Sequence, residues 1–182
     1  AILAPVLAPY DPLAINVTHR LQGPSWEHPF GTDNFGRDLF SRVLLGARLS
    51  LKVGVYVVVF TSLFGTLIGL IAGYYSRLDN VVMRVMDSLM AFPAILLAIA
   101  IMAALGPSEF NVVIALGIVY IPRTSRVVRG SVLALKERDF IEAARGAGAR
   151  DGRILFLHIL PNCLSPLIVQ ATFIFAYAIL AE

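Results

Sequence analysis

The chain has 182 residues, of which 58% are hydrophobic and only 15% are charged, and its formal net charge is +3. Soluble domains carry roughly 25% charged residues, so this composition excludes an ordinary soluble protein and predicts an integral membrane protein. The single cysteine, Cys163, excludes a disulfide within the chain and a cysteine-based metal cluster.

The chain begins in an apolar run that ends at Pro9 and Tyr10. No basic segment precedes this run, as a secretory signal peptide would require. We therefore expect residues 1–10 to be the end of a first transmembrane helix, and the chain to be the middle of a longer polypeptide.

Residues 11–50 form a polar segment with scattered proline, glycine and charged residues, and we expect it to be extracytoplasmic. Gly31 and Gly36 suit turns, which the side chain of Thr32 or Asp33 can cap. Apolar residues then recur at helical spacing, a pattern typical of a helix lying on the membrane surface. These residues are Phe40, Val43, Leu44 and Ala47.

Arg37 and Asp38 follow these turns and allow two interpretations. A charged pair outside the membrane can contact a substrate. More often, such side chains hold a loop in place through hydrogen bonds, and we favour this interpretation for both residues.

Residues 51–182 are expected to form a transmembrane domain. The stretch from 53 to 75 contains no charge and is long enough to span a bilayer, which takes about 20 residues. Gly65, Gly69 and Gly73 repeat every four residues within it. Two successive G-x-x-x-G steps predict close packing against a neighbouring helix, although glycine is also tolerated in membrane helices without such a contact.

Three further spans are predicted. One covers about 81–105, where Pro93 should introduce a kink and where Arg84 and Asp87, three residues apart, should pair near the interface. The next begins near 112 and continues past Arg123, Arg126 and Arg129, and the last begins at 162. The resulting topology places 11–50 and 106–111 outside the cell, and 76–80 and 130–160 inside. More than half of the 15 basic residues lie between 123 and 153, next to the inner side, as the positive-inside rule requires.

The stretch at about 136–161 combines charge, alanine and glycine between two apolar runs. Asp139 and Glu142 have the spacing of a capping box, with Asp139 as N-cap. A helix beginning there has a thin alanine surface, and Gly148 should end it with a positive φ. Pro161 fits the first turn of the next helix. On these features alone the stretch is either an ordinary amphipathic connector or a docking surface for another protein.

Two motifs give the chain a family resemblance. Glu142, Ala143, Ala144 and Gly148, followed by Leu160 and Pro161, resemble the EAA loop of ABC importer permeases, E-A-A-x-x-x-G and then I-x-L-P. His158 replaces the isoleucine, as in the H-x-L-P-N ending that is common in the membrane subunits of dipeptide, oligopeptide and nickel importers. The outer segment is similar to the G-T-D-x-x-G-R-D signature of the same subunits, with Gly31, Thr32, Asp33, Gly36, Arg37 and Asp38 as the matching residues.

The resemblance implies an all-α polytopic transmembrane bundle of the type I ABC importer permease fold, in the cell membrane of a bacterium or archaeon. It also implies that the loop docks on a separate ATPase through Asp139, Glu142, Ala143, Ala144, Gly148, His158, Leu160 and Pro161. The implied partners are a second permease subunit, two cytoplasmic ATPase subunits, an extracytoplasmic solute-binding protein and membrane lipid, but no nucleic acid. The chain itself would be non-catalytic and bind no cofactor or metal, because ATP and Mg²⁺ would belong to the ATPase subunits. Among substrates the resemblance favours peptides, with nickel or another small solute as the alternative.

Other function classes fit less well. A secondary transporter or channel driven by an ion gradient needs no docking loop, and it usually places ion ligands at mid-membrane, where this chain has almost no ionisable residues. A membrane-embedded enzyme would need a catalytic constellation, and none is visible. The chain lacks G-x-x-x-x-G-K-[ST] for nucleotide phosphates, and His19, His28 and His158 lie on different segments, which predicts no metal site.

Overall fold

The computed structural model describes residues 4–181, and it builds them from helices. Within this part of the chain the only β-type pairing is an isolated bridge between Thr32 and Asp38. Three helices are long and apolar enough to cross a membrane, and a bent pair of helices offers a fourth crossing. The prediction of an all-α transmembrane bundle is therefore confirmed.

The chain divides into two compact units, Ala1–Lys52 and Val53–Glu182. The first unit holds α1 (Ala4–Leu7), the short 3₁₀ turn η1 (Val17–His19) and the first turns of α2 (Leu39–Tyr74). Of the segment 1–10, predicted to be the end of a first transmembrane helix, residues 1–3 lie outside the described part, and the rest is helical only in α1.

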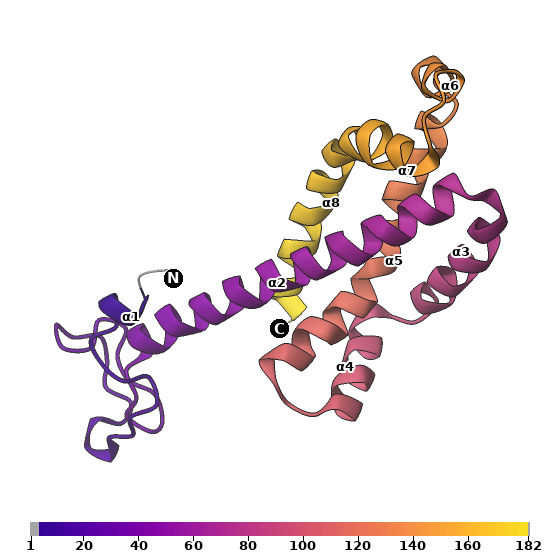
Figure 1. The fold of residues 1–182 in the computed structure, drawn as a ribbon. Coiled ribbons are helices and arrows are strands. Elements are labelled where there is room, and N and C mark those ends of the chain that lie inside the picture. The colour runs from indigo at the N-terminus through magenta and orange to yellow at the C-terminus, as the bar shows by residue number, and fades with distance from the viewer. Residues whose placement is uncertain (1–3, 182) are drawn as a thin grey trace. The chain divides into compact units, whose positions relative to one another are not determined.

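The second unit holds the rest of α2 and all later helices, which Figure 1 shows in chain order. These are α3 (Ser76–Met90), α4 (Ala94–Leu105), α5 (Glu109–Leu135), α6 (Asp139–Gly146), α7 (Asp151–Arg153), the π-helical turn η2 (Ile154–Ile159) and α8 (Leu160–Ala181).

Helix α2 runs without a break from Leu39 to Tyr74. The prediction of a separate surface helix around Phe40 to Ala47 is therefore wrong, since these residues form the first turns of the same helix. Residues 48–52, which separate them from the apolar span, include no glycine or proline, and Gly46 within these first turns costs a helix only about 1 kcal/mol.

The predicted span at 81–105 is broken into α3 and α4, whose axes meet at 90°. Helix α3 begins earlier than predicted, at Ser76, and Pro93 is the N-cap residue of α4. Proline lacks the backbone N–H that a continuing helix needs, and it disfavours helical geometry at the preceding residue, Phe92. With 12 residues, α4 is about 18 Å long, so it is too short to cross a bilayer by itself.

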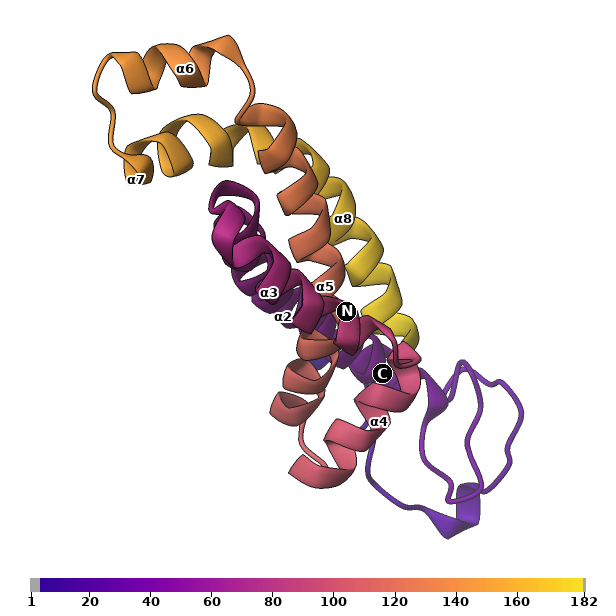
Figure 2. The ribbon, with the colours of Figure 1, turned by 90° about the vertical axis from the view of Figure 1, so that its right-hand side faces the viewer.

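Helix α5 packs against α3, α4 and α8, and Figures 1 and 2 both show α5 and α8 side by side. Two apolar clusters fill the second unit. The first joins the first turns of α2 in this unit, α4, the start of α5 and the end of α8, with Val57, Leu116 and Ile174 among its members. The second joins the end of α2, the end of α5, α6, η2 and the start of α8, with Leu70, Val132 and Ile159 among its members. Helices α2 and α5 therefore run parallel, and α8 runs antiparallel to both.

Candidate functional site

The loop between α5 and α8 contains the short helix α6, which begins at Asp139 after the extended residue Arg138. Arg138 is the N-cap, and it makes no side-chain cap hydrogen bond. The predicted capping box, with Asp139 as N-cap and Glu142 at the third helical position, is therefore wrong by one residue. Both carboxylates nevertheless lie near the first turn of α6, where the helix dipole favours negative charge.

The end of α6 is closed by two backbone hydrogen bonds around Gly148. The N–H of Ala149 donates to the carbonyl of Ala144 over 3.0 Å, and the N–H of Gly148 donates to the carbonyl of Arg145 over 2.9 Å. This pattern is a Schellman motif, which requires a left-handed residue at the position of Gly148. Gly148 has a φ of +80°, as the sequence predicted. The chain therefore leaves α6 at an angle that glycine permits without strain.

The two faces of α6 differ in burial. Ile141 is fully buried and packs with Ile154 and Ile159 in the second cluster, and Ala144 packs against the same cluster. The opposite side is open, and its exposed side chains are Phe140, Glu142, Ala143 and Ala147. The structure thus separates the two alanines on which the predicted docking face was built: Ala143 is accessible, whereas half-buried Ala144 faces the chain's own core. Phe140, which is 44% exposed, was missed by the sequence analysis.

The chain returns from the loop through α7, η2 and α8, which form one helical stretch from Asp151 to Ala181. Pro161 is the second residue of α8, so it lies in the first turn of that helix, as the sequence predicted, although α8 continues directly from η2. Proline removes one helical N–H and pushes its ring toward the preceding turn, and the π-helical turn η2 immediately before it relieves that clash. Asn162 donates from its side-chain nitrogen to the carbonyl of His158 over 2.7 Å. Leu160 packs against the second cluster, while Pro161 itself is exposed.

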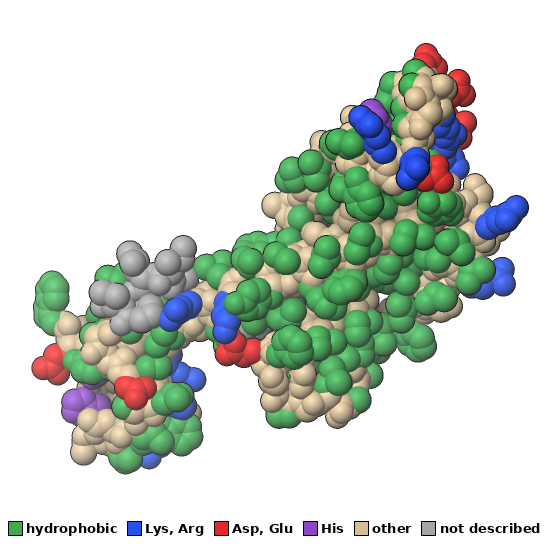
Figure 3. Space-filling view, in the orientation of Figure 1, with side chains coloured by type: hydrophobic (Ala, Val, Ile, Leu, Met, Phe, Trp, Pro, Cys, Tyr) green, Lys and Arg blue, Asp and Glu red, His purple; other side chains and the backbone are tan. Residues whose placement is uncertain are grey.

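The loop is also tied to the end of α2. The hydroxyl of Tyr74 donates to a carboxylate oxygen of Asp151 over 2.6 Å, and Arg145 donates to the same hydroxyl over 3.4 Å. The Arg145 guanidinium lies 5.6 Å from the centre of the Tyr74 ring. Figure 3 shows charged side chains gathered over α6 and α7, beside the predominantly hydrophobic surface of the neighbouring helices. The loop is therefore a charged surface anchored on a transmembrane helix.

The three glycines of α2 lie against α5. A Cβ atom on Gly65 would stand 2.6 Å from the Cβ of Thr124, and one on Gly69 would stand 2.6 Å from the carbonyl oxygen of Ser125. A Cβ atom on Gly73 would stand 2.7 Å from the Cβ of Val132. Contacts this short are not available to real side chains, so the glycines allow α5 to approach the backbone of α2 over three successive turns.

Two ion pairs connect α3 to α5. Arg129 donates from two nitrogens to both carboxylate oxygens of Asp79 over 2.5 Å, and Arg126 pairs with Asp87. The predicted pairing of Asp87 with Arg84 is therefore wrong, because an arginine from another helix takes the carboxylate. The amphipathic helix α3 is thus held by an ion pair near each of its ends against the second half of α5.

In the first unit, the residues of the outer motif bond to one another. The Asp33 carboxylate accepts from the backbone N–H groups of Phe35 and Arg37 over 2.8 and 3.0 Å, and from the Arg37 side chain over 2.8 Å. Burial raises the pKa of this carboxyl, but these donors outweigh burial and lower the pKa to about 2. Gly31 and Gly36 both have positive φ. Arg37 thus belongs to the hydrogen-bonded frame of the loop.

Asp38 is buried beneath the same loop. Its carboxylate accepts from the backbone N–H of Ser41 over 2.7 Å and lies 3.0 Å from Nδ1 of His28. The other ring nitrogen of His28 lies 3.3 Å from Nδ1 of His19. These two histidines belong to separate parts of the outer segment in the sequence, and the fold brings them together. Thr32 is buried as well and donates to the carbonyl of His19.

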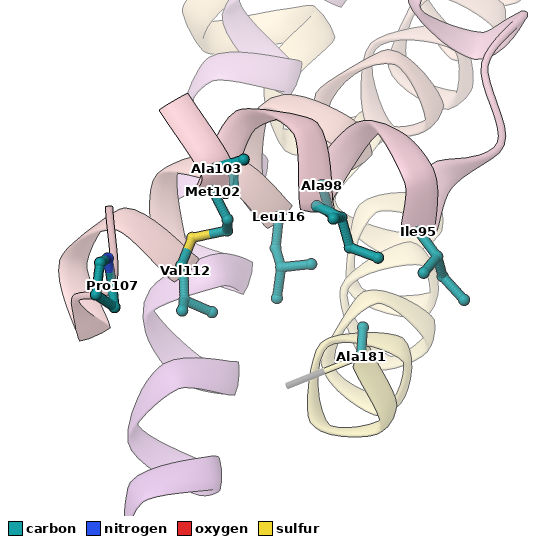
Figure 4. A pocket seen from close by; sticks show the side chains of 10 residues that line it. Ile95, Ala98, Met102, Ala103, Pro107, Val112, Leu116 and Ala181 are labelled. Carbon is teal, nitrogen blue, oxygen red and sulfur yellow. The ribbon is translucent and has the colours of Figure 1, made fainter. Parts of the chain in front are cut away.

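An apolar hollow of about 470 Å³ opens between α4, α5 and the end of α8. Figure 4 shows side chains from these helices around it, among them Met102, Leu116 and Ala181. Its lining offers no charged group. In residues 4–181 no group of three or more His, Cys, Asp and Glu side chains is placed to hold a metal ion.

Comparison with known proteins gives consistent matches. Residues 65–182 match the family described as binding-protein-dependent transport system inner membrane component. The chain is 58% identical over 185 residues to a transport system permease protein of Brucella suis biovar 1, and 55% identical over 181 residues to a dipeptide transport system permease protein of Alkalihalophilus pseudofirmus. It is 46% identical over 187 residues to a di/tripeptide transport system permease protein of Pseudomonas aeruginosa. These alignments cover 100%, 99% and 99% of this chain but only 62%, 60% and 62% of the relatives, so the chain spans about three fifths of their length.

Proposed function

The chain belongs to the family of binding-protein-dependent transport system inner membrane components, and from this premise we propose that it acts as a permease subunit of an ATP-driven importer of peptides. The peptide class rests on the names of the dipeptide and di/tripeptide transport relatives. The chain would be a multi-pass subunit of a bacterial inner membrane, and it would be non-catalytic. A second permease subunit, two cytoplasmic ATPase subunits and an extracytoplasmic solute-binding protein would complete the transporter.

The observation that carries this proposal is the construction of α6. Its inner face, centred on Ile141, is fixed to the second cluster, and its end is fixed by the Schellman motif at Gly148. Its outer face presents small and aromatic side chains next to two carboxylates. A short helix that is rigidly held and has a thin exposed surface is suited to insertion into a cleft on another protein.

The tie between Tyr74 and Asp151 gives the loop a mechanical link to the spans. A displacement of α6 and α7 by a nucleotide-dependent ATPase would pull directly on the end of α2. Because α2 is packed against α5 through Gly65, Gly69 and Gly73, both helices would follow. The two ion pairs from α5 would then carry α3 along. Such a chain of contacts would convert docking movements into rearrangement of the pathway.

The test uses the complete transporter, purified with its partner permease, ATPase subunits and binding protein, and reconstituted in vesicles. Radiolabelled dialanine uptake is measured with ATP, and a cysteine introduced by Ala143→Cys is tested for cross-linking to the ATPase. The matched control is Ala144→Cys, on the half-buried side of the same helix turn. We expect ATP-dependent uptake and a strong cross-link only from Ala143→Cys.

Glu142→Ala provides the functional arm, with Glu137→Ala as its control, because Glu137 is an exposed acid just before α6. We expect the first substitution to lower ATP-driven uptake severalfold while the second leaves it unchanged. Uptake that does not depend on ATP would contradict the proposed function. Full uptake in Glu142→Ala, together with no cross-link in any nucleotide state, would show that the loop is only a connector.

A further inference from the structure

A second hollow, of about 560 Å³, lies where α3, α5 and α8 converge, and it is polar in part. Helix α5 contributes Arg123 and Arg126, helix α8 contributes Gln170 and Tyr177, and Met90 comes from the end of α3. Unlike the apolar hollow of Figure 4, this one presents guanidinium, amide and phenol groups within spans that are otherwise apolar.

Arg123 is held differently from its neighbours on α5. Arg126 and Arg129 are ion-paired with carboxylates of α3. The guanidinium of Arg123 instead lies 5.9 Å from the ring centre of Tyr120 and 5.7 Å from that of Tyr177. These two rings stack with their centres 6.4 Å apart. Among residues 4–181 no carboxylate lies within ion-pair distance of Arg123, so its N–H donors remain available on the side of the hollow.

The depth of Arg123 makes this arrangement informative. It lies 14 positions after Glu109, the first residue of α5, which places it about 21 Å along the helix axis. An arginine at such a depth is costly against lipid and normally faces protein or a water-filled cavity. The aromatic platform fixes the position of the guanidinium without neutralising its charge. The hollow is therefore a site of fixed positive charge inside the membrane domain.

We propose that this hollow is a binding station on the translocation pathway for the carboxylate of a peptide, and the proposal rests on the function proposed above. The planar guanidinium of Arg123 would take the carboxylate through two parallel hydrogen bonds. The Gln170 amide can both donate to and accept from a peptide group, and Phe173 and Tyr177 line the space that a side chain would fill. Every unmodified peptide carries a terminal carboxylate, so one such group serves a transporter that accepts many sequences.

The first experiment measures the local charge in the reconstituted transporter. A Gln170→Cys substitution, in a background carrying Cys163→Ala, is exposed to anionic and to cationic methanethiosulfonate reagents in each nucleotide state. We expect modification in at least one state, with the anionic reagent reacting faster. Arg123→Gln should lower the ratio of the anionic to the cationic reaction rate by about tenfold, because it removes the positive electrostatic field that attracts the anionic reagent into the hollow. Arg84→Gln, on α3 beside a different hollow, should leave the ratio unchanged.

The second experiment identifies the anion. Dialanine and its C-terminal amide are compared as protectants of the Gln170→Cys thiol, in vesicles of phosphatidylcholine alone and with added phosphatidylglycerol. We expect protection by dialanine, little by the amide, and loss of the difference in Arg123→Gln, with Arg123→Lys intermediate because it keeps the charge without the planar fork. Dependence of protection on phosphatidylglycerol would assign the site to a lipid headgroup and overturn the proposal. Absence of modification in every state would likewise overturn it, since the hollow would then be filled by protein or lipid.

The two proposals fail separately. If the wild-type transporter imports no dialanine with ATP, the proposed function is wrong whatever the thiol chemistry shows. If import proceeds normally while Arg123→Gln changes neither the rate ratio nor the protection, the function stands and the binding station is wrong.

Discussion

The hydroxyl of Tyr74 donates a hydrogen bond to the carboxylate of Asp151 over 2.6 Å, although 77 positions separate the two residues in the chain. Tyr74 is the last residue of α2 and Asp151 is the first residue of α7. Arg145, near the end of α6, donates to the same hydroxyl and stacks on the same ring. One phenol therefore joins a transmembrane helix to both short helices of the loop.

Tyr74→Phe should loosen this joint without disturbing the spans. The substitution removes a hydroxyl that both donates and accepts, and such a bond contributes about 0.5–1.5 kcal/mol. We expect faster amide hydrogen exchange in residues 139–153 of the assembled transporter, together with ATP hydrolysis that drives less peptide uptake. Tyr75→Phe is the matched control, since the neighbouring ring is exposed and lies next to Tyr74. Equal exchange in the two variants would mean that the hydroxyl anchors nothing.

Gly69→Ala should destabilise the pairing of α2 with α5. The added Cβ would stand 2.6 Å from the Ser125 carbonyl and 2.7 Å from the Cβ of Val128, so the helices would have to separate. Overpacking of this kind typically costs about 1–3 kcal/mol, which should lower the thermal midpoint of the detergent-solubilised complex by several degrees. Gly46→Ala, earlier on the same helix and with open space around it, should leave the midpoint unchanged or slightly raised. A normal thermal midpoint in both variants would show that the close contact between α2 and α5 does not contribute to the stability of the complex.

Gly148→Ala should misdirect the chain after α6. The left-handed φ of +80° costs an ordinary residue about 1–2 kcal/mol, even though the space around Gly148 is open. Gly146→Ala tests the opposite case, because Gly146 is helical and equally unobstructed. We expect cross-linking from Ala143→Cys to fall in the first variant only. Equal cross-linking in both would indicate that the Schellman motif does not set the direction of α6.

The outer loop should keep its order down to mildly acidic pH. The pKa of the Asp33 carboxyl is about 2 in the folded loop and 3.8 in its ordinary state. A lowered carboxyl pKa adds stability that is complete above the ordinary value and is lost as pH falls through the folded one. We therefore expect amide protection at Phe35 and Arg37 to hold to about pH 4 and to decline toward pH 2. The Asp33→Asn variant should show lower protection at neutral pH and a smaller change across this interval.

The sequence allowed the glycine seam to be anticipated but not its partner. A repeat of glycine every four residues predicts close packing whichever helix is the partner, because it leaves one face of α2 without side chains. That Thr124, Ser125 and Val132 meet these glycines depends on how α5 is placed by the rest of the fold. The positive φ of Gly148 was predictable for the same reason: the end of a helix often needs a left-handed residue, and the sequence supplies a glycine at that point.

Predictions failed where a local pattern competed with distant residues. Arg84 and Asp87 have the spacing of a helical ion pair, yet Arg126 from α5 reaches Asp87 instead. His19 and His28 carry no shared pattern, and only the folding of the outer loop brings their rings within 3.3 Å. The capping-box spacing was misread by one position, because the choice between Arg138 and Asp139 as N-cap is made by backbone geometry that composition does not encode.

The seam between α2 and α5 also limits which movements the second unit can make. At three successive turns a side chain or carbonyl of α5 sits over a glycine, flanked along α2 by larger residues such as Leu70 and Ala72. If α5 slid along α2 by a single residue, it would meet those larger side chains instead of the glycines. The steric clash therefore fixes the register of the two helices. Relative motion must then be taken up elsewhere, and the 90° break between α3 and α4 at Pro93 is one place between α2 and α5 where the helical backbone is already interrupted.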